Sequence, residues 1–203
     1  AGEGGTPVDV LSVAMLRNTD SLLSQALTDE RYRADRNRKP PRKVGSHLAF
    51  WDCLDCDKCI PVCPNDANFE LEVAPFDDDV GVIVVAPTGW REVARRRYTV
   101  RKRIQIANFA DACNDCGNCD VFCPEDGGPY IEKPRFFGSL EAWHRAAPLA
   151  GFVLAADGRG GAGLVLHGRF PGGIFALRAD EVANVDLFST GPVIMRVDRQ
   201  TCG

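Results

Sequence analysis

Eight of the nine cysteines in this chain stand in two runs of identical spacing. Each run reads C-x2-C-x2-C-x3-C-P, the first over residues 53–64 and the second over residues 113–124. Three cysteines spaced in this way let one tight loop hold three irons of a cubane cluster, while the fourth cysteine ligates a second cluster. The spacing predicts two [4Fe-4S] clusters with crossed ligation. One ligand set is Cys53, Cys56, Cys59 and Cys123, and the other is Cys113, Cys116, Cys119 and Cys63.

Two other uses of these cysteines are possible. Paired C-x2-C units also form four-cysteine zinc sites, but zinc has no use for a third cysteine three residues further on. A disulfide framework would suit an oxidising compartment, whereas two metal-type runs without a signal peptide favour a reducing one. We therefore expect iron–sulfur clusters in a cytoplasmic protein, with a zinc-stabilised interaction module as the alternative.

Charge is unevenly distributed along the chain. The formal net charge is −4, and eight thiolates with two oxidised cluster cores would bring it to about −8, from −4 − 8 + 4. The regions around both cysteine runs are acidic, with Lys58 the one basic residue in residues 52–80 and none in residues 111–132. Negative charge near a cluster disfavours the addition of an electron, so this acidity lowers the expected potential.

Two short segments carry the opposite charge. Their basic residues are Arg31, Arg33, Arg36, Arg38, Lys39, Arg42 and Lys43, and then Arg91, Arg95, Arg96, Arg97, Arg101, Lys102 and Arg103. These residues form a solvated face or complement the acidic regions of the same chain, with docking to an acidic partner protein as the alternative. Nucleic-acid binding is not expected, because the chain is acidic overall and few aromatic residues interrupt the basic runs.

The length of 203 residues allows one or two domains with a buried core. No apolar run approaches the roughly 18 residues that cross a bilayer, so we expect no direct membrane insertion. We expect an α+β fold, namely a two-cluster bacterial ferredoxin-like core with a β-rich insertion, an N-terminal helical arm and a small β-rich C-terminal domain. The expected boundaries are 1–45 for the arm and its basic linker, 46–137 for the core with its insertion at about 66–110, and 138–203 for the C-terminal domain.

Hydrophobic periodicity and capping residues predict where helices and strands lie along the chain. Helices are predicted at residues 9–16 and 20–34, and the Pro40-Pro41 pair predicts a linker. Between the cysteine runs, alternation predicts a strand at residues 69–73 and another at 98–109, while residues 82–85 read as a buried strand after a loop at Asp77–Asp79. Ser139 can cap a short helix, and strands are predicted at 151–156, 164–167 and 173–178.

Three further features carry weaker signals. Residues 158–163 fit G-x-G-x-x-G, but a strand follows where a helix should open, so a glycine-rich hairpin turn is the better interpretation. His47 lies beside the first run, yet cysteines already fill every cluster position, which favours a packing or surface role. Cys202 is unpaired by count and has no expected role.

The second run, together with Gly128-Pro129-Tyr130 and Phe136-Phe137, resembles the iron–sulfur module of the family named "putative selenate reductase". The first run is similar to the other cluster loop of that module, and the resemblance covers about residues 46–140. These are large flavoproteins of the glutamate-synthase-like and dihydropyrimidine-dehydrogenase-like type. The resemblance implies two [4Fe-4S] clusters that pass electrons to flavin and NAD(P)H-binding domains, and nothing in this chain matches those domains.

The expected function is therefore electron transfer. The sequence shows no recognisable nucleophile, acid–base pair or open metal position, and all eight motif cysteines belong to closed sites, so no catalytic residue is predicted. We expect an iron–sulfur subunit or domain of a multi-component, flavin- and NAD(P)H-linked oxidoreductase, with a flavoprotein or other redox subunit as partner. The alternative of the same class is a freestanding ferredoxin that carries electrons between enzymes.

Overall fold

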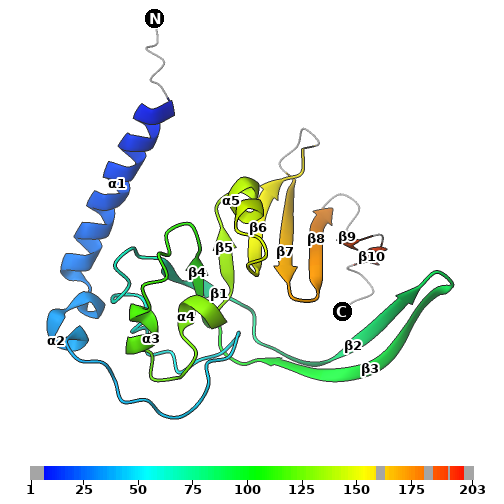
Figure 1. Cartoon of the computed structure of the whole chain (residues 1–203), viewed down its shortest axis with the longest axis horizontal. Helices are drawn as coiled ribbons and strands as arrows, with labels where there is room; N and C mark the ends of the chain where they lie inside the picture. Colours follow the sequence, from blue (N-terminus) through cyan, green and yellow to red (C-terminus); the bar gives the residue numbers. More distant parts are fainter. Residues whose placement is uncertain (1–6, 159–162, 181–184, 192, 199–203) are drawn as a thin grey trace, which may run out of the picture. The chain divides into compact units, whose positions relative to one another are not determined.

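The computed structural model describes residues 7–158, 163–180, 185–191 and 193–198. Contacts divide the chain into two units, Ala1–Pro41 and Arg42–Gly203. Figure 1 shows the helical first unit in blue and the sheet-rich second unit in cyan to red. None of the helices in the described ranges is both long and apolar enough to span a membrane.

The first unit contains one long helix where two were predicted. Helix α1 runs without a break through Pro7–Thr28, followed by a 3-10 turn at Glu30–Tyr32 and the short helix α2 at Ala34–Asn37. Thr19, which lies between the two predicted helices, donates its hydroxyl to the carbonyl of Met15 at 2.9 Å, one turn back inside the helix. The next capping residue along the chain is Asp29, whose carboxylate accepts the N–H of Arg31 at 2.8 Å. The helix therefore ends there.

An eight-stranded sheet dominates the second unit, in the order β1-β4-β5-β6-β7-β8-β9-β10 (Figure 1). The strands are β1 Asn68–Glu72, β4 Ile104–Phe109, β5 Arg135–Phe137, β6 Gly151–Ala156, β7 Leu164–Phe170, β8 Gly173–Asp180, β9 Val185–Thr190 and β10 Val193–Asp198. Strands β4, β5 and β6 pair in parallel, and the other neighbours pair antiparallel. The sheet continues across the boundary expected at residue 138, because β5 pairs with both β4 and β6.

The first cysteine run precedes β1, and the second lies between β4 and β5 with helices α3 (Asn118–Phe122) and α4 (Pro129–Glu132). The predicted strand at residues 98–109 is interrupted before β4 begins. The carboxylate of Asp52 accepts the backbone N–H groups of Arg101 at 2.9 Å and Lys102 at 3.1 Å, which turns the chain there. The predicted strands at 69–73, 151–156, 164–167 and 173–178 are confirmed as β1, β6, β7 and β8.

Helix α5 (Leu140–Arg145) packs on the sheet beside β5 and β6. Its predicted cap is confirmed, since the Ser139 hydroxyl accepts the N–H of Ala142 at 3.0 Å. Trp143 is 2% exposed, packs with Phe137 and Val153, and donates its indole N–H to the carbonyl of Gly151 at 3.1 Å. The apolar core of the C-terminal strands is centred on this tryptophan.

Strands β2 (Phe76–Ala86) and β3 (Gly89–Val100) form a two-stranded sheet of their own within the region where an insertion was expected. The prediction of a loop at Asp77–Asp79 is wrong, because these residues lie in β2. The carboxylate of Asp77 pairs with Arg97 at 2.8 Å and accepts the hydroxyl of Thr99 at 2.7 Å across the strands. The strand at 82–85 is present but not buried, since Val84 is 45% exposed.

Candidate metal centre

The antiparallel pair β1–β4 joins the end of the first cysteine run to the start of the second. Asn68 and Asn108 are cross-strand partners in its register. Asn68 follows Cys63 by five residues and Asn108 precedes Cys113 by five, so strand pairing brings these two cysteines to the same end of the pair. A second junction lies at residues 44–48, where Val44 and Leu48 donate their N–H groups to the carbonyls of Pro124 and Asp126 at 2.9 and 2.7 Å.

The two cysteine loops share an unusual backbone conformation. Asp55 and Asp115 occupy the same place in their runs, and both have a positive φ, of 51° and 53°. The residues after the next cysteine, Asp57 and Gly117, are also left-handed, with φ of 53° and 76°. Left-handed residues recur in the backbone turns of iron–sulfur and phosphate sites. The two loops therefore share a local backbone geometry that is compatible with an anionic group.

Burial of the cysteines follows the same order in both loops. The first cysteine of each run is half-buried, the second, Cys56 or Cys116, is exposed, and the third, Cys59 or Cys119, is buried. The fourth cysteines differ, because Cys123 is 7% exposed whereas Cys63 is half-buried. Each loop thus presents one thiol outward and one inward.

Cysteines from both runs line one cavity beside the first loop. The cavity is narrow and partly open to solvent. The lining includes Cys53, Cys56 and Cys59 from the first run together with Cys123 from the second. These four residues are the first ligand set that crossed ligation predicts. Leu48, Leu54 and Ile106 complete much of the apolar wall.

In the second predicted ligand set, the charges of two cysteines affect the pKa of a third. Burial raises the pKa of the Cys119 thiol, hydrogen bonds from the N–H of Tyr130 and the side chain of Asn68 oppose this shift, and the charges of Cys113 and Cys63 add to it. Cys63 thus lies near thiols of the second run. Its sulfur also accepts the backbone N–H of Ala67 at 3.2 Å, a bond that suits a thiolate.

The two loops are close to each other at their buried cysteines. Burial raises the pKa of Cys59 well above its ordinary value, and the charges of surrounding thiols raise it further. Those thiols are Cys53, Cys56, Cys119 and Cys123. Cys119 belongs to the second loop, so the inward thiols of the two loops interact through their charges.

A buried asparagine pair supports both loops, and sequence reasoning missed it. Asn68 and Asn108 are 2% and 1% exposed, and the amide of Asn108 donates to the side-chain oxygen of Asn68 at 3.0 Å. Asn68 also donates to the carbonyl of Cys59 at 2.9 Å and to the Cys119 thiol, while Asn108 donates to the Cys113 thiol. One asparagine in an acidic strand gives no local signal, because its role depends on the β1–β4 register.

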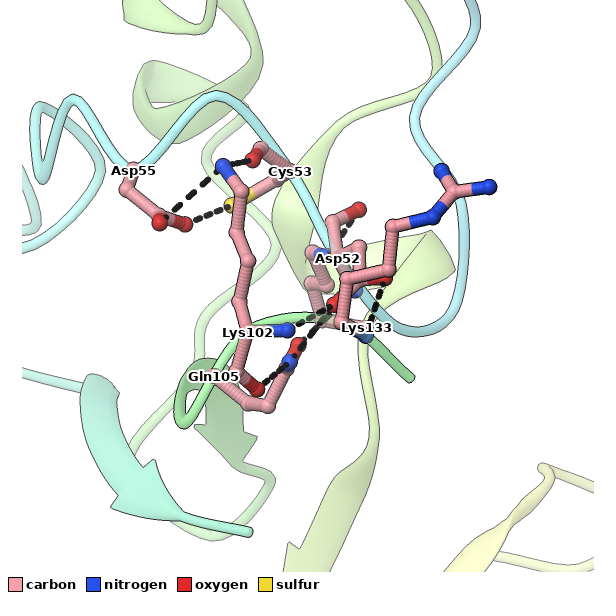
Figure 2. Close-up of polar contacts among 7 residues, drawn as sticks. Asp52, Cys53, Asp55, Lys102, Gln105 and Lys133 are labelled. Carbon is pink, nitrogen blue, oxygen red and sulfur yellow. Dashed lines mark hydrogen bonds and ion pairs between the residues drawn. The ribbon is translucent and has the colours of Figure 1, made fainter. Parts of the chain in front are cut away.

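A second unpredicted network holds the entry to the first loop (Figure 2). The side chain of Gln105 exchanges hydrogen bonds with Asp52, accepting its N–H at 2.8 Å and donating to its carboxylate at 2.9 Å. Lys102 donates to the carbonyl of Cys53 and forms an ion pair with Asp55 at 3.0 Å. Lys133 donates to the carbonyl of Asp52 at 3.4 Å. The basic run after β3 therefore has an intramolecular partner in this loop.

Lys43, from the other basic run, binds backbone carbonyls and carboxylates of the second loop, as Lys102 does at the first. Its ammonium donates to the carbonyls of Asp120 and Glu125 at 3.0 Å each, and pairs with the carboxylates of Asp120 and Asp126 at 3.1 and 3.7 Å. Both basic segments thus contribute a lysine to the acidic cysteine region of the same chain.

The donor set suits a thiolate-bound cluster. Over the described residues, which include all eight motif cysteines, no three His, Cys, Asp or Glu side chains converge on a single-ion position. A cubane cluster is held by thiolates spread over a larger volume than one ion occupies. The soft sulfur donors and the thiol-lined cavity are consistent with such a group.

Other candidate residues lie outside these sites. His47 rests against Gly127, where a Cβ would lie 2.7 Å from its ring, and its Nδ1 contacts the carbonyl of Leu48 at 3.1 Å. Around the glycine-rich segment, β6 and β7 pair antiparallel and Asp157 donates its N–H to Gly163 at 2.9 Å, as predicted for a hairpin. Residues 159–162 and Cys202 lie outside the described residues.

Comparison with known proteins gives a partial similarity. No family model matches the chain, and no solved structure matches it. It is similar to the protein named "Putative oxidoreductase YgfK" of Escherichia coli strain K12 and to the protein of the same name in Escherichia coli O157:H7. Each is 33% identical over 89 residues, which are 42% of this chain and 6% of the relative. The chain thus resembles a small part of two proteins named as oxidoreductases.

Proposed function

We propose that this chain binds two [4Fe-4S] clusters and relays single electrons as an iron–sulfur subunit or domain of a larger oxidoreductase. One observation carries the proposal, namely the cavity that three cysteines of the first run line together with the fourth cysteine of the second. A mononuclear zinc site would use two C-x2-C pairs. It does not require three cysteines of one run to combine with the fourth cysteine of the other. The similarity to a small part of proteins named as oxidoreductases supports a redox role within a larger assembly.

Such clusters, when bound, supply one-electron oxidation and reduction without making or breaking bonds in a substrate. The chain's own residues hold the clusters, exclude water and donate hydrogen bonds to sulfur. The buried asparagine pair and the N–H of Ala67 provide such donors on one side of the two loops.

The cysteine arrangement also suggests a route for electrons. Cys56 and Cys116 are exposed, so each cluster would have an edge near the surface. Cys59 and Cys119 are both buried and their charges interact, so these thiols would lie on the inner sides of the two clusters. An electron could enter at one exposed loop, cross between the buried cysteines and leave at the other loop.

The metal content of anaerobically purified protein tests the proposal. We expect about eight irons per chain and broad visible absorbance that bleaches with dithionite. Colourless protein carrying zinc in place of iron would overturn it and favour the zinc-stabilised module.

Crossed ligation makes a sharper prediction. Cys123→Ser should damage the cluster of the first loop, because Cys123 lines that cavity, and Cys63→Ser should damage the cluster of the second. In EPR spectra of the reduced proteins, the Cys123→Ser variant should lose the signal of the first-loop cluster and keep that of the second. The Cys63→Ser variant should lose the signal of the second-loop cluster and keep that of the first. Cys202→Ser is the matched control, since it removes the one cysteine outside the runs and should leave both signals intact. If each substitution damaged the cluster of its own run, the assignment of ligands would be wrong.

A further inference from the structure

Lys133 is a buried charged residue in the wall of the thiol-lined cavity. It lies between α4 and β5, is 2% exposed, and lines the same cavity as Cys53, Cys59 and Cys123. Figure 2 shows its side chain beside Asp52, whose backbone carbonyl accepts a hydrogen bond from its ammonium at 3.4 Å. Among the described residues, no carboxylate forms an ion pair with it. Its ammonium therefore lacks a salt-bridge partner in the described part of the chain, although the buried carboxylate of Glu125 lines the same cavity.

A buried cation requires compensation, because removing a charge from water is costly. A [4Fe-4S] cluster with four thiolates would supply it, since it carries a net charge of about −2 when oxidised and −3 when reduced. The cation interacts more strongly with the reduced form, and the low dielectric of a buried site increases this difference.

We propose that Lys133 is the counter-charge of the first-loop cluster and sets its reduction potential above that of the second. This inference rests on the proposed function. In a chain that has received one electron, the electron then resides mainly on the cluster held by Cys53, Cys56, Cys59 and Cys123. The second cluster exchanges electrons with it from a lower potential.

Three other charged residues lie in or beside the first cavity, and one of them, the half-buried Asp57, lines it and opposes Lys133. Lys102 is half-exposed and already paired with Asp55 at 3.0 Å, so its field is partly neutralised and screened. Glu125 is 8% exposed and lines the same cavity; one of its oxygens accepts the hydroxyl of Ser46 at 2.9 Å, and the other has no hydrogen-bond partner in the described structure. The negative charge of the Glu125 carboxylate opposes the positive charge of Lys133. Removing one charge or the other should therefore shift the reduction potential of the first-loop cluster in opposite directions.

The second loop lacks an equivalent residue. Besides Lys133 and Glu125, the remaining buried charge among the described residues is Arg169, which stacks over Trp143 at 4.1 Å in the C-terminal core. The charged residues in the groove beside Cys113 are half-buried or exposed, and water screens them. They are Asp111, Asp115, Arg135 and Arg145. The asymmetry between the two sites therefore comes from the first cavity.

An EPR-monitored redox titration of the iron-loaded protein tests this inference. Lys133→Met keeps the length of the side chain and removes its charge. It should lower the higher of the two potentials and reduce the equilibrium preference of the electron for that cluster at least tenfold, which is about 59 mV for one electron. Glu125→Gln should shift the same potential upward, and Lys133→Arg should retain most of the parent value. The lower potential should move much less in all three variants.

Arg145→Met is the matched control, because it removes an exposed cation from the groove beside Cys113, and neither potential should change appreciably. If Lys133→Met loads both clusters with unchanged potentials, the role of Lys133 is refuted while the proposed function stands. If the parent protein loads no iron, both proposals fall. If the Lys133→Met variant fails to bind the first-loop cluster, the Glu125→Gln variant tests the inference in its place. An unchanged higher reduction potential in the Glu125→Gln variant would then overturn the inference.

Discussion

The cysteine-bearing region and the C-terminal strands share one sheet but are stabilised differently. In the C-terminal strands, Phe152, Phe170, Phe175 and Phe188 form a ladder of ring contacts, and Trp143 is buried with Phe137 and Val153. Around the cysteines, the largest fully buried side chains are the amides of Gln105, Asn68 and Asn108. The apolar residues buried there are Leu48, Ile60, Ala67, Val100, Ile106 and Ala107, and none of these six is aromatic. The comparison indicates that aromatic packing stabilises the C-terminal strands, whereas the cysteine region combines buried amides, small aliphatic side chains and, under the proposed function, a bound metal group.

Metal removal should give the largest effect and separate the two regions. Under the proposed function, oxidative loss of the clusters with a chelator present removes the cross-links between the two loops. We expect the backbone amides of β1 and β4 to lose protection in hydrogen exchange measured by mass spectrometry, while β6, β7 and β8 keep theirs. Equal loss of protection in both regions, or no loss in either, would contradict the proposed difference.

Trp143→Ala should have the next largest effect, in the opposite region. The indole is 2% exposed, donates to the carbonyl of Gly151 and stacks with Arg169. Its removal should lower the free energy of unfolding by about 3–5 kcal/mol, as for other large-to-small substitutions in cores. Chemical denaturation measures this loss, and the iron content per folded chain should not change. Trp90→Ala is the control, because Trp90 is 71% exposed and its loss should change stability by less than about 0.5 kcal/mol.

Asn68→Ala should give a smaller loss of stability, located in the cysteine region. It leaves the Cys59 carbonyl and the Asn108 amide without their buried partner, at a cost of about 1–3 kcal/mol. Denaturation of the iron-loaded protein, together with the rate at which it loses iron, measures the effect. Asn65→Ala changes an exposed asparagine nearby and serves as the control. If Asn68→Ala matched its control in both measurements, the buried amide pair would have no supporting role.

Local patterns predicted most elements of the second unit, because their signals lie within a few residues. Alternation located β1 and β6 to within one residue, and Ser139 marked the start of α5. The predictions failed where a distant partner decided the outcome. The three consecutive acidic residues Asp77–Asp79 predicted a loop. They lie in a strand because Asp77 has cross-strand partners in Arg97 and Thr99 on β3. The carboxylate of Asp52, nearly fifty residues away along the sequence, interrupted the strand predicted through Arg101 and Lys102.

The sequence alone determined the chemistry of the candidate centre, since the spacing of the cysteines is a local property that limits what their thiols can hold. The tertiary structure decided which side chains surround those thiols. The register that pairs Asn68 with Asn108, the cavity that Cys123 shares with the first loop and the burial of Lys133 all join segments far apart in the chain. Such neighbours depend on long-range pairing and burial, and these in turn set the electrostatic environment of each cysteine loop.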